Sequence, residues 1–182
     1  MMRSLLALGL SLLGVSAWAQ DVSSGPDVGS KPPALKVFDV TGKHEGKEID
    51  YTADRKELPT VYLFVNAAKF DRPMARFLRE LDTATQNDGG DRYVVAVWVG
   101  GDAAKLKDYL PRVQMSIKLD GTAMAVHEGD ATGPEGWVLN SDAHLTAVVC
   151  HKGKVAAKFG YQSINETDVP AVRKALTKAI GK

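Results

Sequence analysis

The feature that most constrains the fold is an apolar run followed closely by an amphipathic one, between Val61 and Asp82. Residues 61–66 read Val-Tyr-Leu-Phe-Val-Asn, and this β-branched and aromatic run predicts a buried strand. After a short break, apolar residues recur at helical spacing, at Met74, Phe77, Leu78 and Leu81. A strand, a tight turn and a helix form the kind of junction where ligands and nucleophiles often lie in α/β proteins. The junction is therefore the first place to look for a functional site.

Two strand–helix units and two hairpins account for most of the remaining chain. Residues 35–40 and 47–51 alternate loosely around a Gly-containing turn, which predicts an N-terminal hairpin. The helix of the junction is expected to end near Asp82. Residues 93–99 are nearly all apolar and predict a second buried strand, and Asp102 is the expected N-cap of the next helix, which Pro111 should end or kink.

The second hairpin and a last helix close the chain. Residues 145–151 and 154–160 flank a Lys-Gly turn and predict an antiparallel pair. The last helix is expected from about Asp168, with lysines and arginine toward its end, where the helix dipole favours them. Residues 115–144 show no sustained period, and only short irregular pieces are expected there. The order predicts an α/β, three-layer fold: a mixed central sheet, parallel at its centre and antiparallel at its edges, with helices on both faces.

The first residues resemble an export signal. A basic start at Arg3, an apolar run over 4–15 and the small-x-small sequence Ala17-Trp18-Ala19 are typical of a cleaved signal peptide. The run is too short for a stop-transfer helix, so a membrane anchor is the weaker reading and no stable membrane insertion is expected after cleavage. We therefore expect a signal peptide over 1–19, cleavage near Ala19/Gln20, and a periplasmic or secreted protein.

The mature chain has the size of one domain. The Ser/Gly/Pro-rich segment 20–34 has little to bury and is expected to be a flexible arm, which leaves one domain over 35–182. The formal charge is +1, without a basic stripe, so no nucleic-acid partner is expected. Cys150 is the only cysteine, which excludes an intramolecular disulfide.

Several short motifs occur in an order that resembles the thioredoxin superfamily, in particular the secreted redoxins related to peroxiredoxins, thiol-specific antioxidants and cytochrome-maturation thioredoxins. The sequence from Val28 is similar to their V-G-x-x-x-P-x-L opening, and the sequence from Asp39 resembles their D-x-x-G-K hairpin. The segment 61–81 matches their strand, redox loop and first helix, and 148–159 matches their terminal hairpin. The resemblance covers roughly residues 28–180 and implies a thioredoxin-like fold.

The same resemblance shows that the redox loop is degenerate. The family's aromatic-Cys-x-Pro-Cys falls on Phe70-Asp71-Arg72-Pro73-Met74, so the aromatic residue and the proline remain and both cysteines are replaced. Thiol–disulfide exchange needs an attacking thiolate and a second, resolving thiol. The family also has a proline before the Thr that opens the terminal hairpin, and here Leu145 precedes Thr146. The protein is therefore expected to lack dithiol redox activity, and we lean towards a protein that is not an enzyme.

Each residue at the loop also has a structural explanation. Asp71 is a good helix N-cap, Met74 is expected in the core, and Arg72 could bind an anion beside the free backbone N–H groups. We take the surface formed by Lys69 to Pro73 with Leu145 as the expected binding surface. Its partner, a protein or a small molecule, cannot be identified from the sequence.

Two alternative functions remain open. One is a one-cysteine thiol oxidoreductase or peroxidase that uses Cys150, although a cysteine within an apolar strand is usually buried and unreactive. The other is a metal or small-anion binding protein that uses Asp71, Arg72 and a histidine. The histidines are scattered and no metal-ligand spacing is present, so no metal site and no cofactor are expected.

Overall fold

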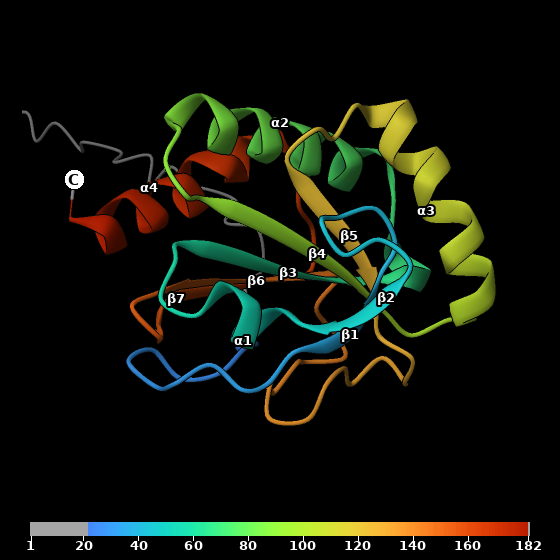
Figure 1. Ribbon diagram of the computed structural model, residues 1–182, viewed down its shortest axis with the longest axis horizontal. Helices are drawn as coiled ribbons and strands as arrows, with labels where there is room; N and C mark the ends of the chain where they lie inside the picture. Colours follow the sequence, from blue (N-terminus) through green and yellow to red (C-terminus); the bar gives the residue numbers. More distant parts are fainter. Residues whose placement is uncertain (1–21, 182) are drawn as a thin grey trace, which may run out of the picture.

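A seven-stranded mixed sheet forms the centre of the protein (Figure 1). It is seen in a computed structural model that describes residues 22–181, so the expected signal peptide lies outside the described residues. The strand order is β2-β1-β5-β4-β3-β6-β7. The strands are β1 (Lys36–Asp39), β2 (Lys47–Asp50), β3 (Thr60–Asn66), β4 (Tyr93–Val99), β5 (Thr122–Val126), β6 (Leu145–His151) and β7 (Lys154–Tyr161).

The pairing agrees with a parallel centre and antiparallel edges. Strand β4 runs parallel to both β3 and β5, while β6 is antiparallel to β3 and to β7. On the other side, β1 is antiparallel to both β2 and β5. The predicted N-terminal and terminal hairpins are therefore both present, as β1–β2 and β6–β7. The α/β, mixed-sheet fold class is confirmed.

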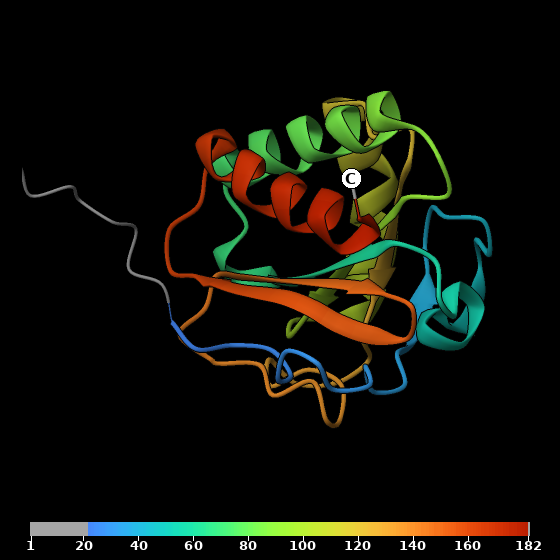
Figure 2. The ribbon, with the colours of Figure 1, turned by 90° about the vertical axis from the view of Figure 1, so that its left-hand side faces the viewer.

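Three long helices cover one face of the sheet (Figure 2). They are α2 (Arg72–Asp88), α3 (Ala103–Ile117) and α4 (Val169–Ile180), while α1 (Tyr51–Arg55) and the 3₁₀ turns η1 (Ala67–Lys69) and η2 (Glu166–Asp168) are short. The connections β3–α2–β4 and β4–α3–β5 step in the same direction across the sheet. Because such crossovers are right-handed, both helices lie on the same face, side by side.

Strand alternation divides the core between the two faces. Leu63 and Val65 of β3 contribute to the core under the three helices, whereas Tyr62 and Phe64 belong to the core on the opposite face. There the ring of Trp137 packs on Phe64, with 4.7 Å between the ring centroids. A strand buried on both faces carries apolar residues at every position, as residues 61–65 do.

Helices lie on both faces, as expected, but within residues 22–181 the second face carries a short helix and no long one. Short α1, the N-terminal segment 22–34 and the loop 127–144 cover it instead (Figure 2). Tyr51 of α1 and Trp137 of the loop are each fully buried in this second core. The sheet is therefore the middle of three layers, and the third layer is largely irregular.

The segment 22–34 is not a free arm, in contrast to the flexible arm expected from its composition. The backbone N–H of Val22 donates to the carbonyl of Gly160 at 2.9 Å, and the N–H of Gly29 donates to the carbonyl of Val155 at 2.8 Å. The glycines permit this close approach: a Cβ on Gly160 would lie 2.2 Å from the Val22 carbonyl oxygen. The composition of segment 22–34 is one that also suits a flexible linker. In this protein it allows the backbone of the segment to pack against the edge of β7.

Several elements differ from the sequence expectation. Strand β5 occupies a central place in the sheet, although only irregular pieces were expected over 115–144. Helix α1 was not foreseen, α2 continues to Asp88, and α3 continues through Pro111 to Ile117. None of the helices within residues 22–181 is long and apolar enough to cross a membrane.

The D-x-x-G motif of the first hairpin proves to be structural. The carboxylate of Asp39, which is fully buried, accepts hydrogen bonds from the N–H of Gly42 at 2.7 Å and from the hydroxyl of Tyr51 at 2.7 Å. A Cβ on Gly42 would lie 2.6 Å from that Tyr51 hydroxyl oxygen. The aspartate and the glycine are therefore needed together to close the turn.

Candidate functional site

The junction predicted to organise the chain lies between the end of β3 and the start of α2. Asn66 ends β3, and its side-chain oxygen accepts from the N–H of Ala68 at 3.1 Å, which starts the turn η1. Asp71 then caps α2, and its carboxylate accepts from the N–H of Met74 at 2.9 Å. The aspartate thus satisfies one of the free N–H groups of the helix and complements its dipole, as predicted.

The apolar and the charged residues at the degenerate loop have opposite environments. Met74, at the position of the family's second cysteine, is 1% exposed and belongs to the core under the helices. Phe70 packs edge-on against Trp98 of β4, with 5.6 Å between the ring centroids. Lys69 and Arg72 are exposed. The loop therefore presents charged side chains to solvent and anchors itself with apolar ones.

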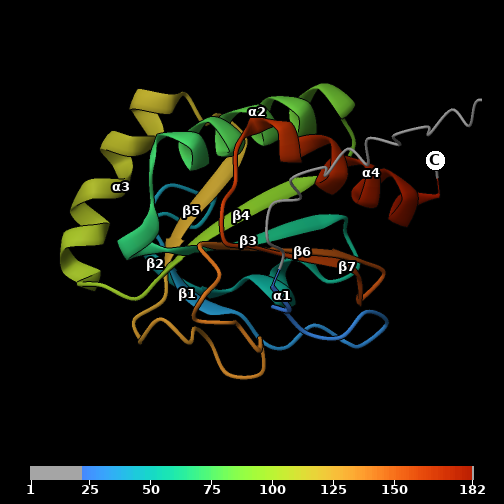
Figure 3. The same ribbon diagram turned by 180° about the vertical axis from the view of Figure 1, so that it is seen from behind.

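A pocket of about 470 Å³ opens beside this loop, between the start of α2 and the second half of α3. Figure 3 shows the start of α2 beside α3. The lining residues are Phe70, Asp71, Arg72, Ala75, Tyr109, Arg112, Val113, Ser116 and Ile117. The volume falls within the range of small-molecule sites. The pocket combines aromatic and aliphatic walls with two arginines and one carboxylate.

Sequence reasoning missed the half of this pocket that α3 contributes. The apolar spacing of residues 103–110 favours burial of Tyr109, and this side chain is instead 44% exposed at the pocket. Arg112 lies beyond Pro111, where the helix was expected to end or bend. The sequence did contain a signal for the contribution of α3, because two consecutive right-handed strand–helix units place their helices side by side.

Leu145 does not belong to the accessible surface, which corrects the binding surface expected from the sequence. Its side chain is fully buried in the core under the helices, and its Cα pairs with that of Val65 in β3. A leucine at the start of a central strand, inside the sheet, gains more from burial than from exposure. The second wall of the site comes from α3 instead.

Cys150 lies far from the junction and on the other face of the sheet. It pairs with Thr60 at the start of β3, whereas Asp71 follows the end of that strand. The six residue steps between Thr60 and Asn66 separate these ends by about 20 Å. The thiol is 5% exposed, and burial raises its pKa to about 12. Cys150 cannot cooperate with the loop and carries little thiolate near neutral pH.

The histidines do not gather at the junction. His44 pairs with Asp54 at 3.2 Å near the first hairpin, and burial lowers the pKa of His127 in the loop after β5. The Nδ1 atom of His151 is buried without a hydrogen-bond partner. Within residues 22–181, no three histidine, cysteine, aspartate or glutamate side chains lie close enough together to hold a metal ion.

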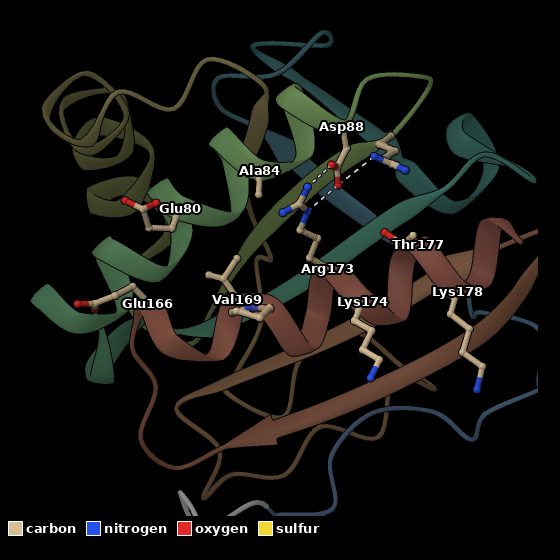
Figure 4. A pocket seen from close by; sticks show the side chains of 11 residues that line it. Glu80, Ala84, Asp88, Glu166, Val169, Arg173, Lys174, Thr177 and Lys178 are labelled. Carbon is tan, nitrogen blue, oxygen red and sulfur yellow. Dashed lines mark hydrogen bonds and ion pairs between the residues drawn. The ribbon is translucent and has the colours of Figure 1, made fainter. Parts of the chain in front are cut away.

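A larger groove, of about 1080 Å³, runs between α2 and α4 (Figure 4). Asp88 is largely buried and forms ion pairs with Arg173 and, at 3.0 Å, with Arg92, whose side chain is the more buried of the pair. Figure 4 also shows Lys174 and Lys178 pointing away from this cluster. Since both arginines of the groove are already paired with Asp88, its size alone does not make it the better candidate.

Comparison with solved structures identifies the fold. A proposed thiol:disulfide interchange protein DsbE from Chlorobium tepidum superposes with a TM-score of 0.62 at 15% identity, covering 86% of this chain and 99% of the other. A peroxidoxin, BcpB, from Mycobacterium tuberculosis gives 0.60 at 13% identity, with 84% and 97% covered. A secreted thiol-disulfide isomerase from Corynebacterium glutamicum gives 0.59 at 12% identity, with 93% and 98% covered.

The comparisons by sequence add no family. No protein-family model matches the chain, and no curated protein is significantly similar to it. Because the structural likenesses have low identity but cover nearly the whole of each chain, they establish a thioredoxin-like fold of the redoxin type.

Proposed function

We propose that this chain, which has a thioredoxin-like fold, uses the site of the redox loop for binding and does not exchange disulfides there. The observation that carries the proposal is the hydrogen bond from the Met74 N–H to the Asp71 carboxylate. This aspartate stands at the position of the attacking cysteine, where it fulfils a capping role. A carboxylate cannot attack a disulfide sulfur, and a buried thioether such as that of Met74 cannot resolve a mixed disulfide.

The environment of Cys150 supports the same proposal. A one-cysteine redoxin needs an accessible thiolate, whereas this thiol is buried and its pKa is raised to about 12. Its place on the face of the sheet opposite α2 also removes it from the end of β3 where the fold offers a pocket. The alternative of a peroxidase or reductase based on Cys150 is therefore disfavoured.

The pocket beside the loop supports the binding part of the proposal. It lies next to the helix start of α2 and carries an exposed tyrosine and two arginines, residue types that are enriched at binding surfaces. In α/β folds the ends of the parallel strands are the usual place for a ligand. The partner is a protein segment or a small molecule that enters between α2 and α3.

We also propose that the chain is exported and cleaved near Ala19/Gln20. The basic, apolar and small-x-small succession of the first 19 residues supports this. Expression of the full chain in a bacterium, followed by cell fractionation and N-terminal sequencing, tests it. Periplasmic protein beginning at Gln20 is expected, and full-length protein that stays in the cytoplasm contradicts it.

Activity assays on the purified mature protein test the central proposal. We expect no reduction of a protein disulfide in the presence of dithiothreitol, and no consumption of hydrogen peroxide, above the uncatalysed rates. Turnover that disappears in Cys150→Ser would overturn the proposal in favour of a one-cysteine enzyme. Native thiol titration provides a second readout, in which Cys150 should react slowly until denaturant is added.

A further inference from the structure

Two arginines at the pocket differ from the other arginines that the structure describes. The side chains of Arg72 in α2 and Arg112 in α3 have no hydrogen bond, ion pair or ring contact with any residue in 22–181. Each of the others has a partner: Arg55 donates to Thr60 and Asp91, Arg76 pairs with Glu166, Arg79 with Glu80, and Arg92 and Arg173 with Asp88. The two guanidinium groups without a partner thus line one cavity, from two different helices.

The rest of the pocket surface is largely apolar. Phe70 and Tyr109 provide aromatic rings, and Val113 and Ile117 provide aliphatic side chains. Tyr109 keeps 44% of its surface exposed, so the rim is open to solvent. A ligand that fits this lining has an apolar body to contact these walls and an anionic head to pair with the arginines.

The charge of Asp71 limits which anion fits. Its carboxylate lines the same pocket, although it is already engaged with the Met74 N–H. With the two arginines and this one carboxylate, the lining carries a net formal charge of +1, which a singly charged head neutralises. A carboxylate also matches the planar fork of a guanidinium, which donates two parallel hydrogen bonds.

We propose that the pocket between α2 and α3 binds an apolar carboxylate, with Arg72 and Arg112 pairing with the carboxylate and Phe70 and Tyr109 contacting the apolar body. This rests on the proposed binding function and specifies its ligand chemistry. The carboxylate belongs either to a small organic acid or to the C-terminus of a peptide with an apolar last residue. Both sources share the same head group and the same kind of body.

Titrations of the ¹⁵N-labelled mature protein, followed by backbone amide shifts in NMR, test the proposal. The probes are 3-phenylpropionate, a pentapeptide ending in phenylalanine, the same pentapeptide with a C-terminal amide, and inorganic phosphate at matched ionic strength. We expect a carboxylate probe to shift the amides of 70–75 and 109–117 saturably, with at least about tenfold higher affinity than the amidated peptide. Phosphate should bind about tenfold more weakly than the best carboxylate. If the pentapeptide with a free C-terminus (the acidic peptide) binds more tightly than 3-phenylpropionate, the natural carboxylate is assigned to a peptide terminus. If 3-phenylpropionate binds more tightly, it is assigned to a small organic acid.

Variants with a matched control locate the binding. Arg72→Gln and Arg112→Gln should each weaken the carboxylate probe by about tenfold, because each removes a charge-assisted hydrogen bond. Arg112→Lys should fall between wild type and Arg112→Gln, since lysine keeps the charge and loses the planar fork. The control Arg79→Gln removes an exposed arginine of α2 that lies outside the pocket, and it should leave the affinity within about twofold. A thermal unfolding midpoint close to that of wild type shows that each variant is folded.

Three results would overturn the inference: equal affinity for the acidic and amidated peptides, amide shifts outside the two helix segments, or the same loss in Arg79→Gln as in Arg72→Gln. Absence of any binding by the carboxylate probes also overturns it. These outcomes leave the proposed absence of dithiol chemistry untouched, because that claim depends on the activity assays and on Cys150→Ser. Disulfide or peroxide turnover, in contrast, would contradict the proposed function whatever the pocket binds.

Discussion

Asp71 has a structural role at the position where the resemblance to redoxins places a nucleophile. A helix that begins directly after a strand needs a side chain to satisfy its first N–H groups, and aspartate does so well. Here the carboxylate accepts the Met74 N–H at 2.9 Å, at the position where the related redoxins have their attacking thiol. The structural need of the helix start is therefore met without a nucleophile.

The cap gives the first prediction. Asp71→Ala should lower the free energy of unfolding by about 1 kcal/mol, because it leaves an N–H of α2 without a partner. Asp71→Ser, which restores a capping oxygen, should recover most of this loss. Urea denaturation followed by circular dichroism measures both variants. An unchanged midpoint for Asp71→Ala would show that the hydrogen bond does not stabilise the helix.

Cys150 gives a prediction about pH. Its thiol titrates at 9.0 when exposed, and burial raises the pKa to about 12 in the folded protein. Above pH 9.0 the unfolded chain therefore loses the proton while the folded chain keeps it, so stability should fall as the pH rises towards 12. The slope from this group is at most about 1.4 kcal/mol per pH unit.

Cys150→Ala isolates that contribution. Burial also raises the pKa values of Tyr51 and Tyr93, and Cys150 is not among the causes, so these tyrosines weaken the fold at high pH equally in both proteins. The difference in unfolding free energy between wild type and variant, measured by urea titration from pH 8 to 10.5, should therefore shrink as the pH rises. A constant difference would mean that the thiol is accessible to solvent in the folded state.

Val138 is held in a conformation that β-branched residues rarely adopt. Its φ is +49°, and 69% of its surface is exposed, so burial does not compensate for the strain. Val138→Asn should raise the unfolding free energy by about 1 kcal/mol, because asparagine tolerates this region. Val28→Asn is the control, at a position that is 60% exposed without a positive φ. If both variants changed the thermal midpoint equally, strain at Val138 would not be the cause.

At the scale of elements, the N-terminal segment belongs to the domain. The hydroxyls of Ser24 and Thr146 lie 2.6 Å apart in the second core, and the N–H of Asn140 donates to the Ser24 hydroxyl at 3.0 Å. These bonds connect the segment 22–34, strand β6 and the loop 127–144. The irregular layer under the sheet is therefore held together by buried polar contacts as well as by apolar ones.

Ser24→Ala tests this connection. It should cost about 1–3 kcal/mol, because it leaves the buried Thr146 hydroxyl and the Asn140 N–H without their partner. Ser23→Ala, at the neighbouring exposed residue, should change the unfolding free energy by less than about 0.5 kcal/mol. Equal, small effects in a chemical denaturation series would show that the segment packs only loosely.

The elements that sequence reasoning predicted are those with a single strong signal. Residues 61–66 form a strand and Met74 to Leu81 form the buried face of a helix because their apolar residues follow one period without interruption. Strand β5 lacked such a signal, since Thr-Ala-Met-Ala-Val is short and rich in alanine, and its place between β1 and β4 comes from tertiary pairing. Local composition was equally uninformative for residues 22–34, whose order depends on the edge of β7.

The candidate site likewise has one part with a local sequence signal and another part that depends on tertiary packing. The loop 70–74 could be found from the sequence because its residues are adjacent and the resemblance is local. Arg112 and Tyr109 lie some 40 residues further along, and only the side-by-side packing of α2 and α3 brings them to the loop. Leu145 was misplaced for a different reason: it pairs with Val65 near the end of β3, but its side chain is buried in the core.

For the molecule as a whole, the thioredoxin-like fold combines the mixed sheet with a pocket where α2 begins, after the end of β3. The only cysteine lies on β6, opposite the start of β3, and on the face opposite α2. Under the proposed function, the differences from a dithiol oxidoreductase lie at positions 71 and 74, together with Leu145, which stands where the resemblance places a proline.

The most direct test of this account compares disulfide reductase turnover by the mature wild-type protein and by the double variant Asp71→Cys/Met74→Cys, with Cys150→Ser in both backgrounds as a control. We predict no turnover above the uncatalysed rate for wild type, and measurable turnover for the double variant that does not depend on Cys150. Turnover by the wild-type protein would contradict the claim that this site has no dithiol chemistry.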